Sequence, residues 1–122
     1  MEKITLDGAF ATFTDYWNPH VAGNVNNMLV KLVKFQGEFV WHHHDAEDEL
    51  FLVHAGRMTM RFRDKEVSLG PGEFIIVPKG VEHCPAADDE CQVLLFEPNT
   101  TLNTGNLINE RTREQLPILA LK

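Results

Sequence analysis

Apolar and polar residues alternate over short stretches in the middle of the chain, and no stretch there repeats with the period of a helix. Residues 28–35 are apolar almost throughout, which predicts a strand that is buried on both faces. In residues 57–63, Met58, Met60 and Phe62 alternate with polar residues, which is typical of a strand with one face in water. The same reasoning predicts strands over residues 38–44, 49–53 and 66–69, and a buried strand over residues 74–77.

Turn-forming residues separate these strands. Gly70-Pro71-Gly72 and Pro78-Lys79-Gly80 combine proline, which fixes φ, with glycine, which accepts a positive φ. Residues 83–85 and 91–96 form the last pair of predicted strands, joined by a hairpin turn at residues 87–89. Many short strands with turns between them are typical of an all-β fold, either an antiparallel sandwich or a small barrel.

The two ends of the chain differ from the middle. Residues 1–27 contain glycine, proline and several asparagines, which predicts a loop-like amino-terminal arm. We expect its aromatic patch to pack against the barrel; the patch consists of Phe10, Phe13, Tyr16 and Trp17. Residues 28–97 form the predicted barrel core, and residues 98–122 a carboxy-terminal tail with a short helix over 110–116. The apolar residues 118–121 are expected to pack on the barrel or on a second subunit.

The composition narrows the classes of partner. A chain of 122 residues is long enough for one domain with one core, and 43% hydrophobic residues are ordinary for a globular protein. A net charge of −7 repels phosphate backbones, so no nucleic-acid partner is expected. No apolar run approaches the roughly 20 residues of a membrane span. The first residues also lack the layout of a signal peptide, which predicts a cytoplasmic protein with no membrane partner.

Two cysteines are too few for a disulfide framework. Cys84 and Cys91 lie on the two strands of the last predicted hairpin, where they can face each other across the pair. In a reducing compartment we expect both to be buried thiols.

A group of histidines with one glutamate carries the chemistry. Side chains alternate between the faces of a strand, so His42 and His44 point the same way and His43 points the other. Glu49 begins the next predicted strand, and His83 follows later in the chain. Imidazole nitrogens with one anionic oxygen are what a divalent metal ion requires, and they leave room for water or substrate. The sequence therefore predicts a metal site.

The remaining histidines and the acidic residues nearby have simpler interpretations. His20, His43 and His54 are expected to be structural, as isolated histidines usually are. The acidic residues of segment 45–48 are expected to form a solvated turn. A contact from one of these carboxylates to an imidazole N–H is the alternative.

The spacing of the histidine group resembles the two sequence motifs of the cupin superfamily. The first motif appears as Gly37, four residues, His42-x-His44, four residues, Glu49, six residues and Gly56. Its first gap is one residue shorter than in the family. The second motif appears as Gly72, five residues, Pro78-x-Gly80, two residues and His83, with Ala87 where the family has asparagine. The resemblance covers about residues 28–97 and points to small single-domain bacterial cupins, including sugar-phosphate-isomerase-like ones.

The resemblance implies a cupin double-stranded β-helix, also called a jelly-roll barrel. It also implies that His42, His44, Glu49 and His83 coordinate one divalent metal ion per chain inside the barrel. Iron, manganese, nickel, cobalt and zinc all accept these ligands. An open position on such an ion permits polarisation of a carbonyl, activation of water or binding of dioxygen. Glu49 is in addition a candidate catalytic base, because substrate can displace it from the ion.

Two classes of function remain open on the sequence alone. The first is a metal-dependent enzyme of isomerase, cyclase, lyase or dioxygenase type that acts on a small polar molecule bearing a carbonyl group. Tyr16, the only tyrosine, is a candidate acid or base if the arm folds over the barrel mouth. The second is a non-catalytic protein that binds a sugar or metabolite with the help of the metal. Either protein is expected to form a homodimer.

Overall fold

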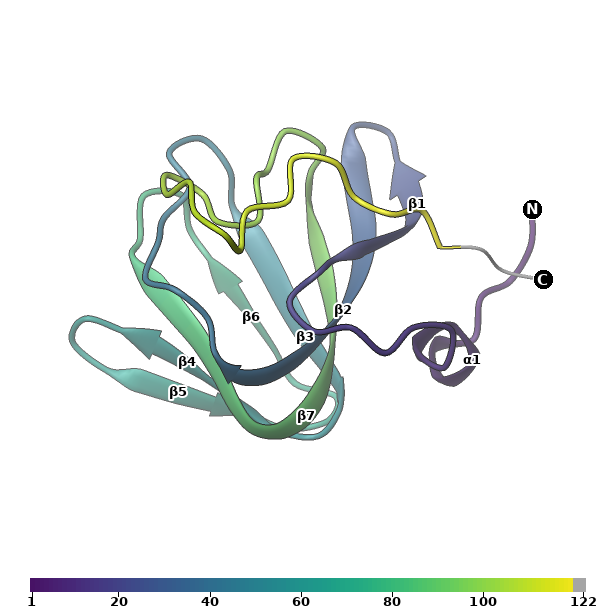
Figure 1. Cartoon of the computed structure of the whole chain (residues 1–122), viewed down its shortest axis with the longest axis horizontal. Helices are drawn as coiled ribbons and strands as arrows, with labels where there is room; N and C mark the ends of the chain where they lie inside the picture. Colours follow the sequence, from purple (N-terminus) through teal and green to yellow (C-terminus); the bar gives the residue numbers. More distant parts are fainter. Residues whose placement is uncertain (120–122) are drawn as a thin grey trace.

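The computed structural model describes residues 1–119 and shows a nearly all-β protein (Figure 1). The helix of this part, α1, spans Leu6–Phe10, and the arm also contains strand β1, His20–Val25. The barrel strands are β2 Met28–Glu38, β3 Glu49–Ala55, β4 Met58–Phe62, β5 Glu66–Leu69, β6 Phe74–Val77 and β7 His83–Pro98. Within residues 1–119, no helix has the length and apolar character needed to cross a membrane.

Paired strands are antiparallel, and β7 joins the two halves of the barrel. The strands follow the order β1-β2-β7-β3-β6, while β4 pairs with β5 and with the beginning of β7. Residues 83–86 of β7 pair with β4, and the later part of β7 pairs with β2 on one side and β3 on the other. Figure 1 shows how strongly β7 curves to do this. The predicted all-β jelly-roll barrel is therefore confirmed.

The predicted hairpin turn at residues 87–89 is wrong, because β7 continues through this stretch. Opposite the register shift between Phe35 and Gly37 of β2, the extra residues of β7 form an exposed, irregular segment. Extra residues on one strand of a pair bend that strand and increase its twist. Cys84 and Cys91 therefore lie along one strand as free, buried cysteines and not on two paired strands.

Two other strand predictions need correction. Residues 38–44 do not form a strand: His42 makes only an isolated bridge to His83, and the backbone after it is irregular. β6 is a strand but not a buried one, since Phe74 and Ile76 are 59% and 53% exposed. β6 ends the strand order and pairs with β3 alone, so one of its faces is left in water.

The arm and the tail also differ from the predictions. The arm contains α1 and β1 instead of loop alone, and β1 extends the sheet by pairing with β2. The tail contains turns instead of the helix predicted over 110–116. There the Asn109 side chain accepts a hydrogen bond from the backbone N–H of Arg111, and Thr112 Oγ1 accepts one from that of Asn109. Such bonds offer the backbone an alternative to the helix.

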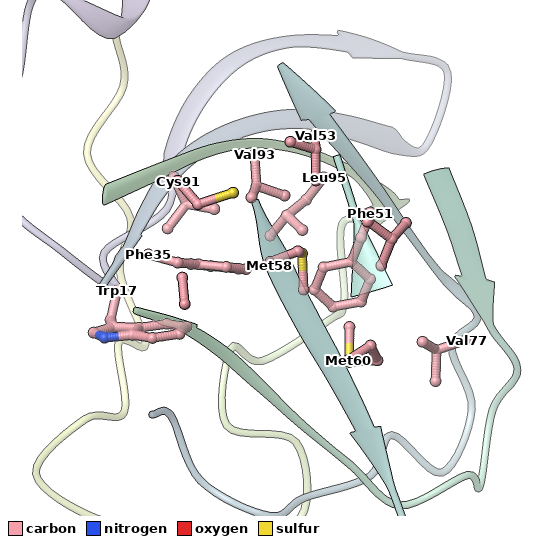
Figure 2. Packing of buried hydrophobic residues seen from close by; sticks show 13 residues of the cluster. Trp17, Phe35, Phe51, Val53, Met58, Met60, Val77, Cys91, Val93 and Leu95 are labelled. Atoms are coloured by element: carbon pink, nitrogen blue, oxygen red, sulfur yellow. The ribbon is translucent and has the colours of Figure 1, made fainter. Parts of the chain in front are cut away.

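The main core lies between the strands. Figure 2 shows Trp17 of the arm stacked on Phe35 of β2, with ring centres 4.3 Å apart. Met58 and Met60 enter the same cluster from β4, as the alternation in that strand predicted. An aromatic residue of the arm is therefore part of the barrel core.

A second apolar cluster attaches the arm to the other face of β2. Phe10 and Phe13 pack there against Leu32. Near the end of the tail, Leu119 packs against the same cluster, while the neighbouring Ile118 is exposed. The rest of the predicted apolar end, residues 120 and 121, lies outside the described residues.

Candidate metal centre

The structure brings together all four residues that the sequence singles out as metal ligands. His42, His44, Glu49 and His83 each offer one ligand atom, and these atoms lie within 4.8 Å of one another. All four residues are buried. Glu49 Oε1 lies 3.2 Å from His44 Nε2 and 3.3 Å from His83 Nε2. The cluster therefore has the size of a site for one ion.

The four side chains come from three parts of the fold. Glu49 is the first residue of β3, and His83 is the first residue of β7. His42 and His44 lie in the irregular segment that precedes β3. Two backbone hydrogen bonds between His42 and His83, 3.0 and 2.9 Å long, join this segment to the beginning of β7. The segment is thus positioned by an isolated bridge and not by a strand ladder.

The tail fixes the other side of the histidine segment. The backbone N–H of Asn106 donates to the carbonyl of His43 at 3.0 Å, and the backbone N–H of His43 donates to Asn106 Oδ1 at 2.9 Å. Gly105 permits this approach, because a Cβ at its position would clash with the carbonyl oxygen of His43. Its φ of +57° also favours glycine. Residues beyond the barrel strands therefore contribute to the geometry of the site.

Backbone carbonyls orient two of the imidazole rings. His42 Nδ1 lies 2.9 Å from the carbonyl oxygen of Val40, and His83 Nδ1 lies 2.9 Å from that of Val81. A ring that donates from Nδ1 to a carbonyl leaves a lone pair on Nε2, which is the form that binds a metal ion. Both rings are therefore held in a metal-binding orientation.

Several buried polar atoms of the cluster lack a hydrogen-bond partner within the described part of the chain. They are both ring nitrogens of His44, Nε2 of His83 and Oε1 of Glu49. Buried polar atoms are normally paired, because leaving them unpaired costs free energy. A divalent cation among three imidazole nitrogens and one carboxylate oxygen would satisfy His83 Nε2, Glu49 Oε1 and one ring nitrogen of His44. The residues present therefore fit the metal ion that the sequence predicts.

The electrostatics of the cluster keep the ligands in the protonation states that a metal ion needs. Burial lowers the pKa of His42 to about 4, and the nearby His83 acts in the same direction, so the ring stays neutral. Burial alone would raise the pKa of Glu49, but the imidazoles of His44 and His83 hold it well below its usual range. The site thus combines a neutral His42 imidazole with an ionised Glu49 carboxylate.

The acidic residues before β3 contact other parts of the protein. Asp48 accepts a hydrogen bond from the backbone N–H of Lys79 at 2.8 Å, and Glu47 accepts one from the hydroxyl of Thr100 at 2.8 Å. Asp45 pairs with His43, whose ring points away from the cluster. These contacts match a surface turn better than a set of carboxylates that orient the ligand imidazoles.

The other histidines lie outside the cluster. His20, His43 and His54 each contact an aspartate at the surface. The ring of His20 also stacks on Phe13, and that of His54 stacks on Phe10. Two of these histidines therefore help to attach the arm to the barrel.

A small pocket of about 30 Å³ opens beside the cluster. His42 and Glu49 line it, so two of the four ligand side chains face this space. Most of its wall is apolar; the wall includes Trp17, Val33, Phe35, Phe39, Phe51 and Leu95. Apolar walls with a few polar groups are typical of sites that bind small molecules.

The pocket also contains a buried ion pair that sequence reasoning missed. Lys31 Nζ lies 3.6 Å from Glu97 Oε2, and both side chains line the pocket. Burial raises the pKa of Glu97 well above its ordinary value, the charge of Glu49 raises it further, and Lys31 opposes the rise. The signal in the sequence was a lysine inside the apolar run 28–35, where the strand has no polar face to receive it.

Tyr16, the predicted acid or base, lies elsewhere. Its side chain is 39% exposed, and its hydroxyl donates a hydrogen bond to Glu90 Oε1 at 2.8 Å. This hydrogen bond is the main reason why the pKa of Tyr16 is raised. The neighbouring Trp17 enters the pocket instead, and its indole N–H donates to the carbonyl of Gln36. The structure does not bring Tyr16 to the ligand cluster.

Comparison with known proteins establishes the family. The family model of the cupin domain matches residues 28–97, which is more than half of the chain. This chain is a cupin. The matched part of the cupin begins with the first residue of β2 and ends one residue before the end of β7, so it contains all four ligand residues.

Solved structures share the fold of this cupin. A cupin-2 domain containing protein from Shewanella frigidimarina is 43% identical, with a TM-score of 0.77 over 78% of this chain and 93% of that chain. Protein NMB1881 from Neisseria meningitidis is 32% identical, with a TM-score of 0.73 over 80% of this chain and 99% of that chain.

A curated relative matches a shorter part of this cupin. The uncharacterized protein YdbB of Bacillus subtilis is 43% identical over 60 residues, which are 48% of this chain. The match covers 53% of YdbB, so the cupin spans about half the length of that relative.

Proposed function

We propose that this cupin binds one divalent metal ion at His42, His44, Glu49 and His83 and uses it to transform a small molecule that bears a carbonyl group. The main support is the group of buried ligand atoms without partners, which lies at the wall of an apolar pocket. A divalent ion bound there supplies Lewis acidity toward a carbonyl oxygen.

The four ligand residues have different relations to the pocket. His44 and His83 do not line the pocket and serve only to hold the ion. His42 and Glu49 hold the ion and also face a small molecule bound in the pocket. Glu49 is the group best placed to accept a proton from the bound small molecule, because it faces the pocket and stays ionised. Proton removal next to a polarised carbonyl is a step that isomerase, cyclase and lyase reactions share. The apolar wall keeps competing water away from it.

Metal content is the first test of this proposal. Elemental analysis of protein purified without added metal, and again after loading with iron, manganese, nickel, cobalt or zinc, should find one ion per chain for at least one metal. The His44→Ala variant should hold little or none under the same conditions. A wild-type protein that binds none of these metals contradicts the proposal.

Proton exchange tests the reaction. Metal-loaded protein in heavy water should exchange the proton next to the carbonyl in at least one member of a panel of small ketones and oxo acids, as measured by NMR. The Glu49→Gln variant, compared at equal metal content, should lose this exchange. Binding without exchange or turnover under every metal would support a non-catalytic metal-dependent binding protein instead.

The homodimer and the cytoplasmic location stay predictions. Phe74 and Ile76 on the outer face of β6 offer an apolar surface that a second chain can cover. Light scattering at micromolar concentration tests the homodimer, and a monomer there contradicts it.

A further inference from the structure

Lys31 places an ammonium group at the wall of the pocket. The side chain is 2% exposed. Within residues 1–119, its ionic partner is Glu97 Oε2 at 3.6 Å, beyond the usual hydrogen-bond length, and that oxygen accepts no hydrogen bond. An ammonium group has three donors, and the pair with Glu97 leaves them available to a molecule in the pocket.

Lys34, three residues along the same strand, shows how this protein pairs a lysine that has a structural role. Its Nζ donates to the carbonyl of Phe13 at 2.7 Å and lies 5.0 Å from the centre of the Phe13 ring. Glu90 adds a carboxylate oxygen at 3.9 Å. Lys34 thus joins the arm to the outer face of β2, and its ammonium group is used within the fold. The ammonium group of Lys31 is not used in this way.

The other polar groups of the pocket already have partners or a role. The Asn103 side chain donates to the carbonyl of Arg111 at 2.7 Å and accepts from the backbone N–H of Arg113 at 2.8 Å. His42 and Glu49 belong to the metal centre. Lys31 and its neighbour Glu97 are the lining groups that remain for a bound molecule.

Strand register places Lys31 across the pocket from the metal ligands. Lys31 pairs with Leu95 of β7, and Leu95 pairs with Phe51 of β3. Glu49 precedes Phe51 by two residues and so shares its inner face. β2 and β3 are therefore separated by β7 alone, which sets their backbones about 10 Å apart. A molecule with one ring and two polar ends has the right length to contact Lys31 and the metal centre together.

We infer that Lys31 determines the specificity of this pocket by binding the carboxylate of a small oxo acid whose carbonyl oxygen lies toward His42 and Glu49. This inference rests on the proposed function, since it names the class of molecule that the metal centre would act on. The apolar wall between the two ends contacts the body of the molecule. Glu97 holds the lysine in position from the side.

A carboxylate suits this pocket better than a phosphate. Lys31 is the one cationic side chain among the lining residues. Glu97 lies beside it, and Glu49 lies across the pocket from it. A phosphate ester carries nearly two negative charges at neutral pH. With a divalent ion at the metal centre, the ion, one ammonium group and two carboxylates would leave one net positive charge, which the single charge of a carboxylate balances more closely than the charge of a phosphate.

The test measures binding of 4-acetylbenzoate, whose carboxylate and carbonyl lie at opposite ends of one ring, and of its methyl ester, which lacks the negative charge, with phenyl phosphate as the competing anion. The zinc-loaded protein carries Trp41→Phe, because Trp41 lies against Arg63 outside the pocket. Quenching of Trp17 fluorescence then reports occupancy. The wild-type pocket should bind the acid about tenfold to a hundredfold more tightly than the ester, as expected for hydrogen bonds to a charged group.

Variants of Lys31 should change this ratio. Lys31→Met should bring the acid-to-ester ratio close to one, and Lys31→Arg should retain most of the preference. Because Lys31→Met leaves Glu97 without its partner, the double variant Lys31→Met/Glu97→Gln serves as the neutral version that is expected to fold. Lys34→Met is the matched control: it should lower stability and leave the ratio unchanged.

Three results would overturn the inference: no binding of the acid, an unchanged ratio in both variants that lack the lysine, or tighter binding of phenyl phosphate than of the acid. Zinc content, measured on every variant, separates this inference from the proposed function. A Lys31-dependent preference in protein that holds no zinc would overturn the metal site alone. One zinc per chain with no preference for the acid would overturn the role of Lys31 alone.

Discussion

The two ends of the barrel interior are built from the same strands and have opposite chemistry. In the apolar end, Val53 of β3 lies opposite Val93 of β7 in the main core. In the polar end, four residues earlier along β3, Glu49 lies in the pocket with Lys31 of β2 and Glu97 of β7. Strand alternation points all five side chains inward, and it decides nothing about their polarity.

This difference separates the part of the interior that stabilises the fold from the part that is suited to bind a metal ion or a small molecule. Burial of apolar side chains in the apolar end is favourable. Burial of charged side chains in the polar end is costly unless they are paired, and the pairing there is incomplete. Residues that cost stability in a folded protein are typical of functional sites. Substitutions in the apolar end should therefore lower mainly the free energy of unfolding, and substitutions in the polar end should lower mainly metal binding.

The largest effect is expected from Met60→Ala in the apolar end. Met60 is fully buried in the main core, so its truncation leaves a cavity. The free energy of unfolding, measured with urea, should fall by about 2–5 kcal/mol. The metal content of the folded variant should stay at the wild-type level. A parallel loss of metal would show that the two ends are not independent.

His44→Ala makes the converse change in the polar end. Within residues 1–119, neither ring nitrogen of His44 has a hydrogen-bond partner, so its removal takes away only the ionic contact with Glu49 from the metal-free fold. The wild-type protein should lose about 2.7 kcal/mol of stability on chelation if free metal was present at a hundred times its Kd. Thermal unfolding with and without a chelator should show this loss in wild type and in Met60→Ala, and none in His44→Ala. An equal chelator effect in all three proteins contradicts the assignment of the ligands.

Gly105→Ala tests whether the tail positions the polar end. The positive φ of Gly105 and the nearby carbonyl of His43 make a side chain unfavourable there, which should cost about 1–3 kcal/mol. Metal affinity, measured by competition with a chelator, should fall as well, because the histidine segment must move. Gly23→Ala is the matched control, since a Cβ at Gly23 meets no atom within 4 Å. If both variants bind metal equally, the tail does not position the site.

The smallest effect concerns Cys91, a thiol in the apolar end. Burial raises the pKa of Cys91 from 9.0 to about 11. The unfolded chain loses this proton at a lower pH than the folded protein does, so the free energy of unfolding decreases as the pH rises from about 9 to about 11. The decrease should be about 1 kcal/mol at about pH 10. Urea unfolding across this range should show it in wild type and not in Cys91→Ala; identical slopes would mean that the thiol is not shielded from water.

The sequence was sufficient to predict the barrel and the four residues that the structure brings together as candidate ligands. Alternation identified strands such as β4, and the spacing of His42, His44, Glu49 and His83 identified the family without any knowledge of the backbone between them. The backbone that positions His42 and His44 was predicted less well. It is held by an isolated bridge between His42 and His83, which leaves no alternation of apolar and polar residues in the sequence.

The misses have related physical causes. The sequence predicted a hairpin within β7 because the acidic residues 88–90 have the composition of a turn. A bent strand with exposed extra residues has the same composition, so composition alone does not distinguish the two. β6 was predicted to be buried because an apolar run does not show whether a strand is at the end of a sheet. Lys31 and Glu97 were missed because their proximity depends on the pairing of β2 with β7, which is a property of the fold.

The course of β7 has a consequence for how this site can change. His83 at its beginning and Glu97 near its end both lie beside Glu49, although a straight strand of this length would separate them by roughly 50 Å. The exposed stretch at residues 88–90 is where the strand reverses enough to bring both ends back. An insertion or deletion in that surface stretch alters the separation of two groups around the same carboxylate. The surroundings of Glu49 can thus be altered from the surface of the protein, without a substitution in the cluster itself.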